Sequence, residues 1–418
     1  MSAEIASLRV RTTVVIAMVA IGILLVTLCA QAPAAKRSDD KKGDDQDKVV
    51  KGPKGLKFYK PPKPLPKAHG ELIWWRGASG VTALADDRFT KLVLYSSRSP
   101  QGERIAVSGS VSVPKGKAPK GGWPVITFAH GTTGVADVCA PTRDRVGGPL
   151  NGGTAYIDPL LNEWLRAGYA VVRTDYQGLG TPGNHPYLIG VSEGRGVLDI
   201  IHAARDLDDR IGRRFLVAGH SQGGHAALFA AGLARAWAKG LKLRGTVAFA
   251  PASHILEQVS LLPLLTDPSG LTALATLIVD GASTQSRAIN VQALLSDRVL
   301  AFYPFLQTEC IGQLGSSSRL GGVPPSEIQR PGSDLSPLFP ELAKMNPLVL
   351  SRAPIMIAQG EADTTVFPNF TDQLNDELVG AGDQVTYRKY PGVGHGDIPF
   401  ASQADTLVFL RERLPPPR

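Results

Sequence analysis

The sequence predicts an α/β fold in which a mainly parallel sheet is covered by helices on both faces. Two observations carry this prediction. Apolar runs of strand length alternate with helical segments over residues 123–252, and the alternation resumes over residues 353–414. Strands that are joined through helices run in the same direction, and their helices cover the faces of the sheet. Ligands of such sheets bind at the carboxyl ends of the strands.

An antiparallel hairpin is expected before the parallel strands. KLVLYSS (91–97) and RIAVSGSVSVP (104–114) alternate apolar and polar residues and are separated by the turn-forming SPQGE. The remaining elements alternate along the chain. The expected strands are 123–131, 169–178, 214–221, 243–252, 353–363 and 384–395, and the expected helices are 162–169, 194–207, 223–240, 368–382 and 401–414.

The alternation is interrupted between residues 254 and 351. This stretch is rich in Leu, Pro and Ser, and LTALATLIV (271–279) and VQALLSDRVLAFYPFL (291–306) have the spacing of amphipathic helices. It is too long for a plain connection between two elements. We therefore expect a cap or lid insertion at 254–351, over an α/β core formed by residues 71–253 and 352–418.

The amino terminus has the pattern of an export signal. Arg9 and Arg11 precede an uncharged run over residues 12–30, and small residues follow that run. The run is also long enough to span a bilayer. Residues 1–34 are therefore expected to be a signal peptide or a membrane anchor. Either places the folded part outside the cytoplasm, secreted or tethered through residues 12–30.

A Lys- and Pro-rich segment follows over residues 35–70. It contains few apolar residues and is expected to be a disordered linker, because it has little surface to bury. Between Lys36 and Lys67 eleven Lys or Arg stand against five Asp, which accounts for most of the formal charge of +8. The rest of the chain is close to neutral, so nucleic-acid binding is not expected.

Two cysteines, Cys139 and Cys310, lie beyond the amino-terminal segment. Two cysteines in an exported protein can form one disulfide, and a pair of separate buried thiols is the alternative. Neither belongs to a Cys or His spacing that is typical of zinc, so no metal site is expected.

The candidate nucleophile is Ser221 in GHSQG (219–223). G-x-S-x-G is the pattern of a tight turn between a strand and a helix that exposes a serine hydroxyl. Glycine is frequent in this chain, and GVSEG (190–194) fits the same pattern. Only GHSQG directly follows a buried strand and opens an Ala-rich helix, so its context selects Ser221.

A serine nucleophile needs a base, and that base needs an orienting acid. Where this turn is used, the acid and then the His follow the serine, each after a later strand. Asp363 comes just after the apolar strand PIMIA, and His395 comes just after VTYRKY. These positions predict a catalytic triad of Ser221, Asp363 and His395.

Other ionisable residues have simpler explanations. His220 and His225 lie too close to Ser221 along the chain to reach it, and they are expected to pack or to orient the turn. Glu361 is nearer to its strand than Asp363 is, and Asp397 is expected to cap the last helix. The other histidines lie in a helix, at the start of the insertion, or in Pro- or Gly-rich stretches: His202, His254, His69 and His185.

Attack on an ester carbonyl creates an oxyanion, which two backbone amides are expected to stabilise. One belongs to Gln222, the residue after the nucleophile. The other is assigned to Thr132 in HGTTG (130–134), the loop after an earlier strand. The alternative is an ordinary Gly turn, with His130 as a structural hydrogen-bonding residue.

Asp175, in TDYQGLG (174–180), follows the second parallel strand. It is expected either to fix the loops around the site or to act only as a turn former. We therefore regard His130 and Asp175 as candidates for holding the loops around the site in place.

Together, HGTTGVADVCAPT, TDYQGLGTPG, GHSQGGHAAL, QGEADTTV and GVGH resemble the secretory lipase family, relatives of lipase A within the α/β-hydrolase superfamily. The resemblance covers roughly residues 90–415. It implies a helical cap that shapes an acyl pocket, and triacylglycerol lipase or carboxylesterase activity. Two residues depart from the pattern: Gln177 stands where many hydrolases of the fold carry Arg, and Gln222 is larger than the Gly of several fungal-type members.

The expected function is the hydrolysis of carboxylic esters or lipids through an acyl-enzyme on Ser221, with no metal or organic cofactor. A second hypothesis is a cell-envelope acyltransferase that uses the same triad. A third is a surface-tethered binding protein that has kept the fold without the chemistry. The presence of all three triad residues argues against the third hypothesis.

Overall fold

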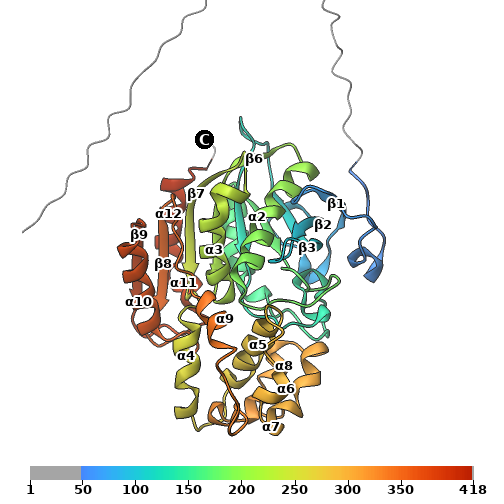
Figure 1. The fold of residues 1–418 in the computed structure, drawn as a ribbon. Coiled ribbons are helices and arrows are strands. Elements are labelled where there is room, and N and C mark those ends of the chain that lie inside the picture. The colour runs from blue at the N-terminus through green and yellow to red at the C-terminus, as the bar shows by residue number, and fades with distance from the viewer. Residues whose placement is uncertain (1–48, 417–418) are drawn as a thin grey trace, which may run out of the picture. The chain divides into compact units, whose positions relative to one another are not determined.

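The computed structural model describes residues 49–416. A nine-stranded sheet lies at the centre, in the order β1-β2-β3-β5-β4-β6-β7-β8-β9, with helices on both faces and a group of short helices beyond one end (Figure 1). The expected signal or anchor at 1–34 and the first part of the expected linker lie outside the described residues. Within residues 49–416 no helix is both long and apolar enough to span a membrane.

The predicted α/β fold with a mainly parallel sheet is confirmed. Six neighbouring strands, β5, β4, β6, β7, β8 and β9, are parallel. Beyond β5 the sheet continues through β3, β2 and β1, and each of these pairs antiparallel with its neighbour. The predicted hairpin is β2 and β3, whereas β1 was not expected. The strands are β1 Leu72–Gly77, β2 Asp87–Arg98, β3 Arg104–Pro114, β4 Trp123–Ala129, β5 Ala170–Thr174, β6 Ile211–His220, β7 Lys242–Phe249, β8 Ile355–Gly360 and β9 Val385–Tyr390.

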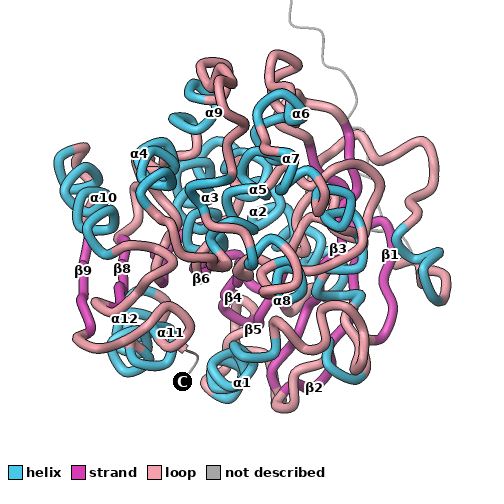
Figure 2. Tube along the Cα trace, turned by 90° about the horizontal axis from the view of Figure 1, so that it is seen from below, coloured by secondary structure: helices cyan, strands magenta, loops and turns pink. Residues whose placement is uncertain are grey.

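Helices cover both faces of the sheet (Figure 2). One face carries α2 (Gly190–Leu207), α3 (Gln222–Trp237) and α10 (Pro368–Gly380); the other carries α1 (Asp158–Arg166), α11 (Ile398–Ala401) and α12 (Gln403–Arg413). The Ala-rich α3 packs closely because Ala226, Ala227 and Ala230 are fully buried against the strands. On the opposite face α1 buries Trp164 completely.

The stretch that was expected to form a cap contains six short helices, which lie beyond the carboxyl ends of the parallel strands (Figure 1). It has its own apolar core, in which Leu277, Leu306 and Leu314 are fully buried. The helices are α4 Ile255–Leu261, α5 Leu271–Ser283, α6 Val291–Leu294, α7 Asp297–Leu300, α8 Ile311–Leu314 and α9 Phe339–Lys344. This part of the chain therefore covers the edge of the sheet at which ligands of α/β folds bind.

One expected helix of the cap, residues 291–306, is wrong as a continuous helix. The side chains of Asn290 and Ser296 each cap the start of a short helix, α6 and α7. Between these helices Leu295 pairs with Gln329 as an isolated β-bridge, and the segment ends in a 3₁₀ turn over Tyr303–Gln307. The two caps thus divide into short helices a segment whose apolar periodicity alone predicts one continuous helix.

The expected disordered linker is wrong for residues 49–70, which are folded onto the core. Phe58 is fully buried and Tyr59 is 3% exposed, and both pack on the apolar face of β2. The Gly52 amide donates to the Trp75 carbonyl at 2.7 Å, and the Tyr59 hydroxyl donates to the Thr142 carbonyl at 2.7 Å. The average composition is polar, but two aromatic anchors and backbone pairing with β1 suffice to order the segment.

Candidate active site

Ser221 lies in the turn between β6 and α3. Its backbone has φ of 60° and ψ of −119°, which a residue with a side chain adopts only when the surrounding structure imposes it. The flanking glycines make the turn fit: a Cβ on Gly219 would overlap the Gly223 carbonyl, and one on Gly223 would overlap the Ala129 carbonyl. GHSQG therefore forms the exposed strand-to-helix turn that its pattern predicts.

The second match to the pattern, GVSEG, belongs to a helix. Ser192 lies in the first turn of α2 and is 3% exposed. Its hydroxyl donates to Gln177 Oε1 at 2.6 Å in the protein interior. Only GHSQG thus has the geometry of a nucleophile turn.

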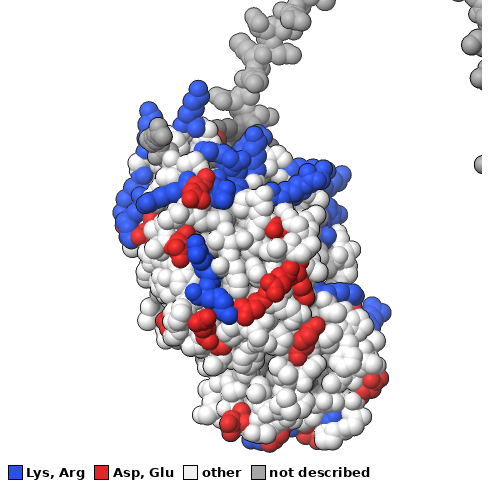
Figure 3. Space-filling view, turned by 90° about the vertical axis from the view of Figure 1, so that its left-hand side faces the viewer, with Lys and Arg blue, Asp and Glu red and all other residues white. Residues whose placement is uncertain are grey.

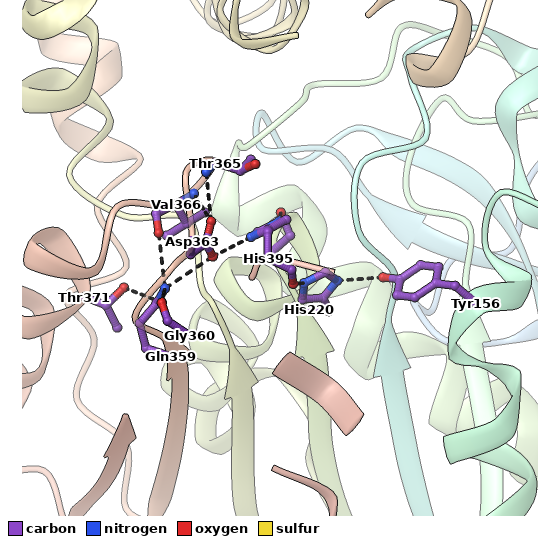
Figure 4. A network of polar contacts seen from close by, with 10 residues as sticks. Tyr156, His220, Gln359, Gly360, Asp363, Thr365, Val366, Thr371 and His395 are labelled. Carbon is purple, nitrogen blue, oxygen red and sulfur yellow. Dashed lines mark hydrogen bonds and ion pairs between the residues drawn. The ribbon is translucent and has the colours of Figure 1, made fainter. Parts of the chain in front are cut away.

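The structure brings Ser221, His395 and Asp363 together from three separate strand ends. His395 Nε2 lies 2.9 Å from Ser221 Oγ. His395 Nδ1 lies 2.7 Å from Asp363 Oδ2 (Figure 4). With Nδ1–H donated to the carboxylate, Nε2 is left to accept the proton of the serine hydroxyl.

Asp363 is buried and held by several donors. Its Oδ1 accepts the backbone amides of Thr365 at 2.8 Å and Val366 at 2.9 Å, and its Oδ2 also accepts Gln359 Nε2 at 3.2 Å (Figure 4). Burial acts to raise the pKa of this carboxyl, but the hydrogen bond and charge of His395 and the two amides outweigh it, so the pKa lies below its ordinary value. Asp363 is therefore ionised and orients His395.

The neighbouring carboxylates lie outside this arrangement. Glu361 is exposed, with its carboxylate 4.0 Å from Lys389 Nζ. Asp397 precedes the short helix α11 rather than the last helix, and its side chain makes no capping hydrogen bond, so the expected capping role is wrong. Of the three candidate acids, only Asp363 contacts His395.

His395 is also held from its backbone side, by a contact that sequence reasoning missed. His220 donates Nε2–H to the His395 carbonyl at 2.9 Å, and its Nδ1 accepts the Tyr156 hydroxyl at 2.6 Å (Figure 4). Burial lowers the pKa of His220 to about 3, so this imidazole stays neutral and keeps both bonds. The sequence signal that could have indicated this contact is the position of His220 in the nucleophile turn, next to Ser221.

The two residues assigned to the oxyanion site lie beside Ser221. Gln222 is the first residue of α3, and the first amides of an α-helix have no partner within the helix. Thr132 lines the same cavities as Ser221, and its hydroxyl is paired with that of Tyr187 at 2.7 Å. Both positions are consistent with backbone donors that face the reacting carbonyl.

His130 belongs to the HGTTG loop that also carries Thr132, and Asp175 contacts the segment that follows this loop. His130 Nδ1 is bonded to the Gly131 carbonyl at 2.7 Å, its ring packs on Tyr176, and burial lowers its pKa to about 4. Asp175 is more than a turn former: it accepts Ser108 Oγ at 2.6 Å and the Thr142 amide at 3.1 Å. It thereby joins β3 to the loop that follows HGTTG.

The expected disulfide between Cys139 and Cys310 is confirmed. Cys139 lies in the loop after β4, and Cys310 precedes α8 of the cap. Next to the disulfide, the Ile311 amide donates to the Thr133 carbonyl at 2.9 Å. The bridge therefore fixes one side of the cap to the loop that carries Thr132.

Replacing both Cys139 and Cys310 by alanine is expected to lower the free energy of unfolding by about 2–5 kcal/mol, because the bridge closes a long loop of the unfolded chain. The two residues are 171 positions apart. The measurement is denaturant unfolding of the variant and of the wild type with and without reductant. Equal stability of the variant and the oxidised wild type would contradict the expectation.

A cavity of about 860 Å³ opens at Ser221. The turn at Ser221, the loop that contains Tyr156 and the cap all contribute to its lining. The cap contributes the apolar Leu264, Leu265, Leu271, Leu274 and Ile311 and the polar Thr266, Asp267 and Ser269.

A smaller, mainly apolar pocket of about 70 Å³ also borders Ser221; we call it the channel, and both α4 and α5 contribute to its lining. A further cap cavity of about 420 Å³ shares the lining residues Val259, Leu262 and Ala275 with this channel. Among the described residues, no group of three His, Cys, Asp or Glu side chains is placed to hold a metal ion.

The model of a known family, the secretory lipases, matches residues 147–293, which include the GHSQG turn. The resemblance of the chain to the secretory lipase family is therefore confirmed. A curated relative, "Lipase A" of Moesziomyces aphidis, is 26% identical over 209 residues, 48% of this chain. The match covers 44% of that protein, less than half of its length.

Solved structures share the fold. Candida antarctica lipase A in its closed state superposes with a TM-score of 0.72 at 19% identity, over 86% of each chain. The rice cell wall degrading esterase LipA from Xanthomonas oryzae superposes with a TM-score of 0.66, again at 19% identity, over 83% of this chain and 98% of its own. These likenesses support the α/β-hydrolase fold.

The two departures from the secretory lipase pattern now have structural explanations. Gln177 makes no ion pair; its side-chain oxygen accepts the Ser192 hydroxyl. Gln222 is 1% exposed, and its side chain lies in the interior behind the turn. Gln222 and Gln177 belong to one network of hydrogen bonds, because His185 contacts the side chain of the first and the carbonyl of the second.

Proposed function

We propose that this relative of lipases and esterases is an exported serine hydrolase of carboxylic esters. The observation that carries the proposal is the chain of contacts from Ser221 Oγ to His395 Nε2 at 2.9 Å and from His395 Nδ1 to Asp363 Oδ2 at 2.7 Å. A hydroxyl that is coupled to an oriented imidazole is the arrangement that makes serine nucleophilic near neutral pH.

The first half-reaction forms an acyl-enzyme. Ser221 Oγ attacks the ester carbonyl carbon while its proton moves to His395 Nε2, and Asp363 stabilises the resulting imidazolium. The amides of Thr132 and Gln222 receive the negative oxygen. The carbon–oxygen bond to the alcohol then breaks, and the proton on His395 Nε2 passes to the departing oxygen.

The second half-reaction restores the enzyme. Water takes the place of the alcohol, gives one proton to His395 Nε2 and attacks the acyl carbon. The bond to Ser221 Oγ breaks, and His395 returns its proton to that oxygen. The products are one carboxylic acid and one alcohol, and no cofactor takes part.

The test is product analysis with p-nitrophenyl esters and triglycerides, with and without an added acceptor alcohol. The proposal predicts acid in equimolar amount to the released alcohol, and loss of turnover after treatment with a fluorophosphonate. Transfer of the acyl group to the added alcohol in preference to water would replace the hydrolase by an acyltransferase. Absence of both reactions would contradict the proposal.

The apolar lining of the channel supports an acyl chain as the group next to Ser221. Ile255, Val259, Leu271 and Ile278 surround this path. Burial of each methylene group favours binding by about 0.8 kcal/mol, so a chain that extends along the channel gains affinity with length.

Replacing Ala275 by leucine tests this path, because Ala275 lines both the channel and the further cap cavity. The loss of room for two methylene groups is expected to lower kcat/KM for long-chain esters about tenfold. Activity on a butyrate ester, measured on the same preparation, is the control and is expected to change little. An equal effect on esters of both chain lengths would contradict the placement of the acyl chain in the channel.

Export is the second part of the proposal. The Cys139–Cys310 disulfide supports it, because disulfides persist in oxidising compartments. The expected signal or anchor at 1–34 would direct the chain there. Recovery of active, oxidised protein from the medium or from the outer side of a membrane is the expected result; a reduced protein retained in the cytoplasm would contradict it.

A further inference from the structure

A carboxylate with no exposed surface lies behind the nucleophile turn. Glu193 stands in the first turn of α2 and belongs to the GVSEG segment. Its Oε1 accepts Gln222 Nε2 at 2.8 Å and the Leu188 amide at 3.1 Å, and its Oε2 is paired with His225 Nδ1 at 2.8 Å. A buried carboxylate is costly unless donors surround it, and here three donors do.

Glu193 reaches one assigned oxyanion residue, Gln222, directly. The Gln222 amide group donates one hydrogen to Glu193 Oε1 and the other to His185 Nε2, at 3.1 Å. His185 in turn donates Nδ1–H to the Gln177 carbonyl at 2.8 Å, and burial lowers its pKa, so it is neutral and can accept at Nε2. Both hydrogens on Gln222 Nε2 are therefore used.

Glu193 reaches the other assigned residue, Thr132, through the loop that precedes α2. The Leu188 amide, which it accepts, is next to Tyr187, whose hydroxyl is paired with Thr132 Oγ1. Leu188 itself has a positive φ of 56°, a conformation that needs external support in a residue with a branched side chain. One carboxylate thus supports the residues on both sides of the reacting carbonyl.

The fully buried His225 is held at both ring nitrogens. Its Nδ1 lies 2.8 Å from Glu193 Oε2, and its Nε2 lies 2.9 Å from the Met345 carbonyl. One carboxylate oxygen of Glu193 is therefore fixed by His225, while the other holds the Gln222 side chain and the Leu188 amide.

We propose that Glu193 is a positioning residue of the esterase site, which sets the spacing of the Thr132 and Gln222 amides by anchoring the Gln222 side chain and the Leu188 loop. The inference rests on the proposed function. It assigns a role in the reaction to Glu193, which lies in GVSEG, the second match to the G-x-S-x-G pattern. It also explains the bulky Gln222, whose side chain serves as the anchor.

The main variant is Glu193→Ala, with Glu193→Gln as the conservative variant. Loss of the carboxylate is expected to lower kcat about 10²-fold, the size of a displacement of about 1 Å at a catalytic group, with little change in KM. Glutamine can still accept from Gln222 and Leu188 through its oxygen and donate to His225 Nδ1, so Glu193→Gln is expected to restore most of kcat.

Asp199→Ala is the matched control. Asp199 is an equally buried carboxylate of the same helix, and it accepts His69 Nδ1 at 2.6 Å, Ser97 Oγ at 2.6 Å and Trp237 Nε1 at 2.8 Å, away from Ser221. This variant is expected to lose stability while its kcat per folded molecule stays near the wild-type value.

Two measurements separate positioning from general damage. The affinity of a boronic acid that forms a tetrahedral adduct with Ser221 should fall in proportion to kcat/KM in Glu193→Ala. In a double-mutant cycle, Gln222→Met should add little to the effect of Glu193→Ala, since both remove the same anchor.

Additive effects, or a kcat of Glu193→Ala equal to that of the wild type, would overturn the inference while leaving the proposed function intact. Absence of Ser221-dependent turnover in the wild type would overturn the proposed function, and this inference with it.

Discussion

Replacing Ser221 by alanine is expected to lower kcat for ester hydrolysis by about 10⁶-fold, the loss that follows removal of the nucleophile in a serine triad. The alanine side chain retains the Cβ, so the turn between β6 and α3 keeps its backbone. Initial rates with p-nitrophenyl butyrate, and the Tm as a check of folding, measure the effect.

Ser192→Ala is the control for this substitution. Ser192 is the serine of the second G-x-S-x-G match, and its loss removes one partly buried hydrogen bond to Gln177. A modest loss of stability with kcat preserved is expected. If Ser192→Ala were the inactive variant and Ser221→Ala the active one, the assignment of the nucleophile would be reversed.

Asp363→Asn is expected to lower kcat by about 10⁴-fold. The amide would present N–H groups to His395 Nδ1, which then becomes an acceptor, and the ring proton would move to Nε2. A protonated Nε2 cannot take the proton of Ser221. The size of the side chain is unchanged, so the loss reports the tautomer of His395 rather than a cavity.

Glu361→Gln is the matched control for Asp363→Asn. Both residues follow β8, but Glu361 is exposed, and its carboxylate lies 4.0 Å from Lys389 Nζ. Its kcat should remain at the wild-type value. Comparable losses in the two variants would show that the strand end as a whole, and not the bond to His395, determines activity.

The arrangement of Ser221, Asp363 and His395 could be predicted from the sequence because each of these residues directly follows a strand. An apolar strand fixes where its carboxyl end lies, so Ser221, Asp363 and His395 were placed at one edge of the sheet before any contact was known. The disulfide was predictable for a different reason: only two cysteines were available beyond the amino-terminal segment.

Contacts that depend on helix packing could not be predicted in this way. Glu193 and Gln222 each open a helix, and whether the starts of α2 and α3 meet depends on the distance and angle between these helices. The bond between His220 and the His395 carbonyl likewise needs the path of the loop after β9. No local pattern in the sequence reports such distances.

Composition misled at the amino-terminal segment. Lysine and proline dominate residues 49–70, and an average over them predicts disorder. Phe58 and Tyr59 nevertheless find an apolar surface on β2, which belongs to a distant part of the chain. Order in this segment comes from the partner surface, which composition does not describe.

The most direct test of the account is to identify the acylated residue. The protein would be mixed with an excess of a p-nitrophenyl ester, quenched in acid within the first turnover and digested, and the acyl group located by mass spectrometry. We expect one acyl group on the Ser221 hydroxyl of the wild type, and none in Ser221→Ala. Acyl transfer to another residue, or turnover without any covalent adduct in the wild type, would contradict it.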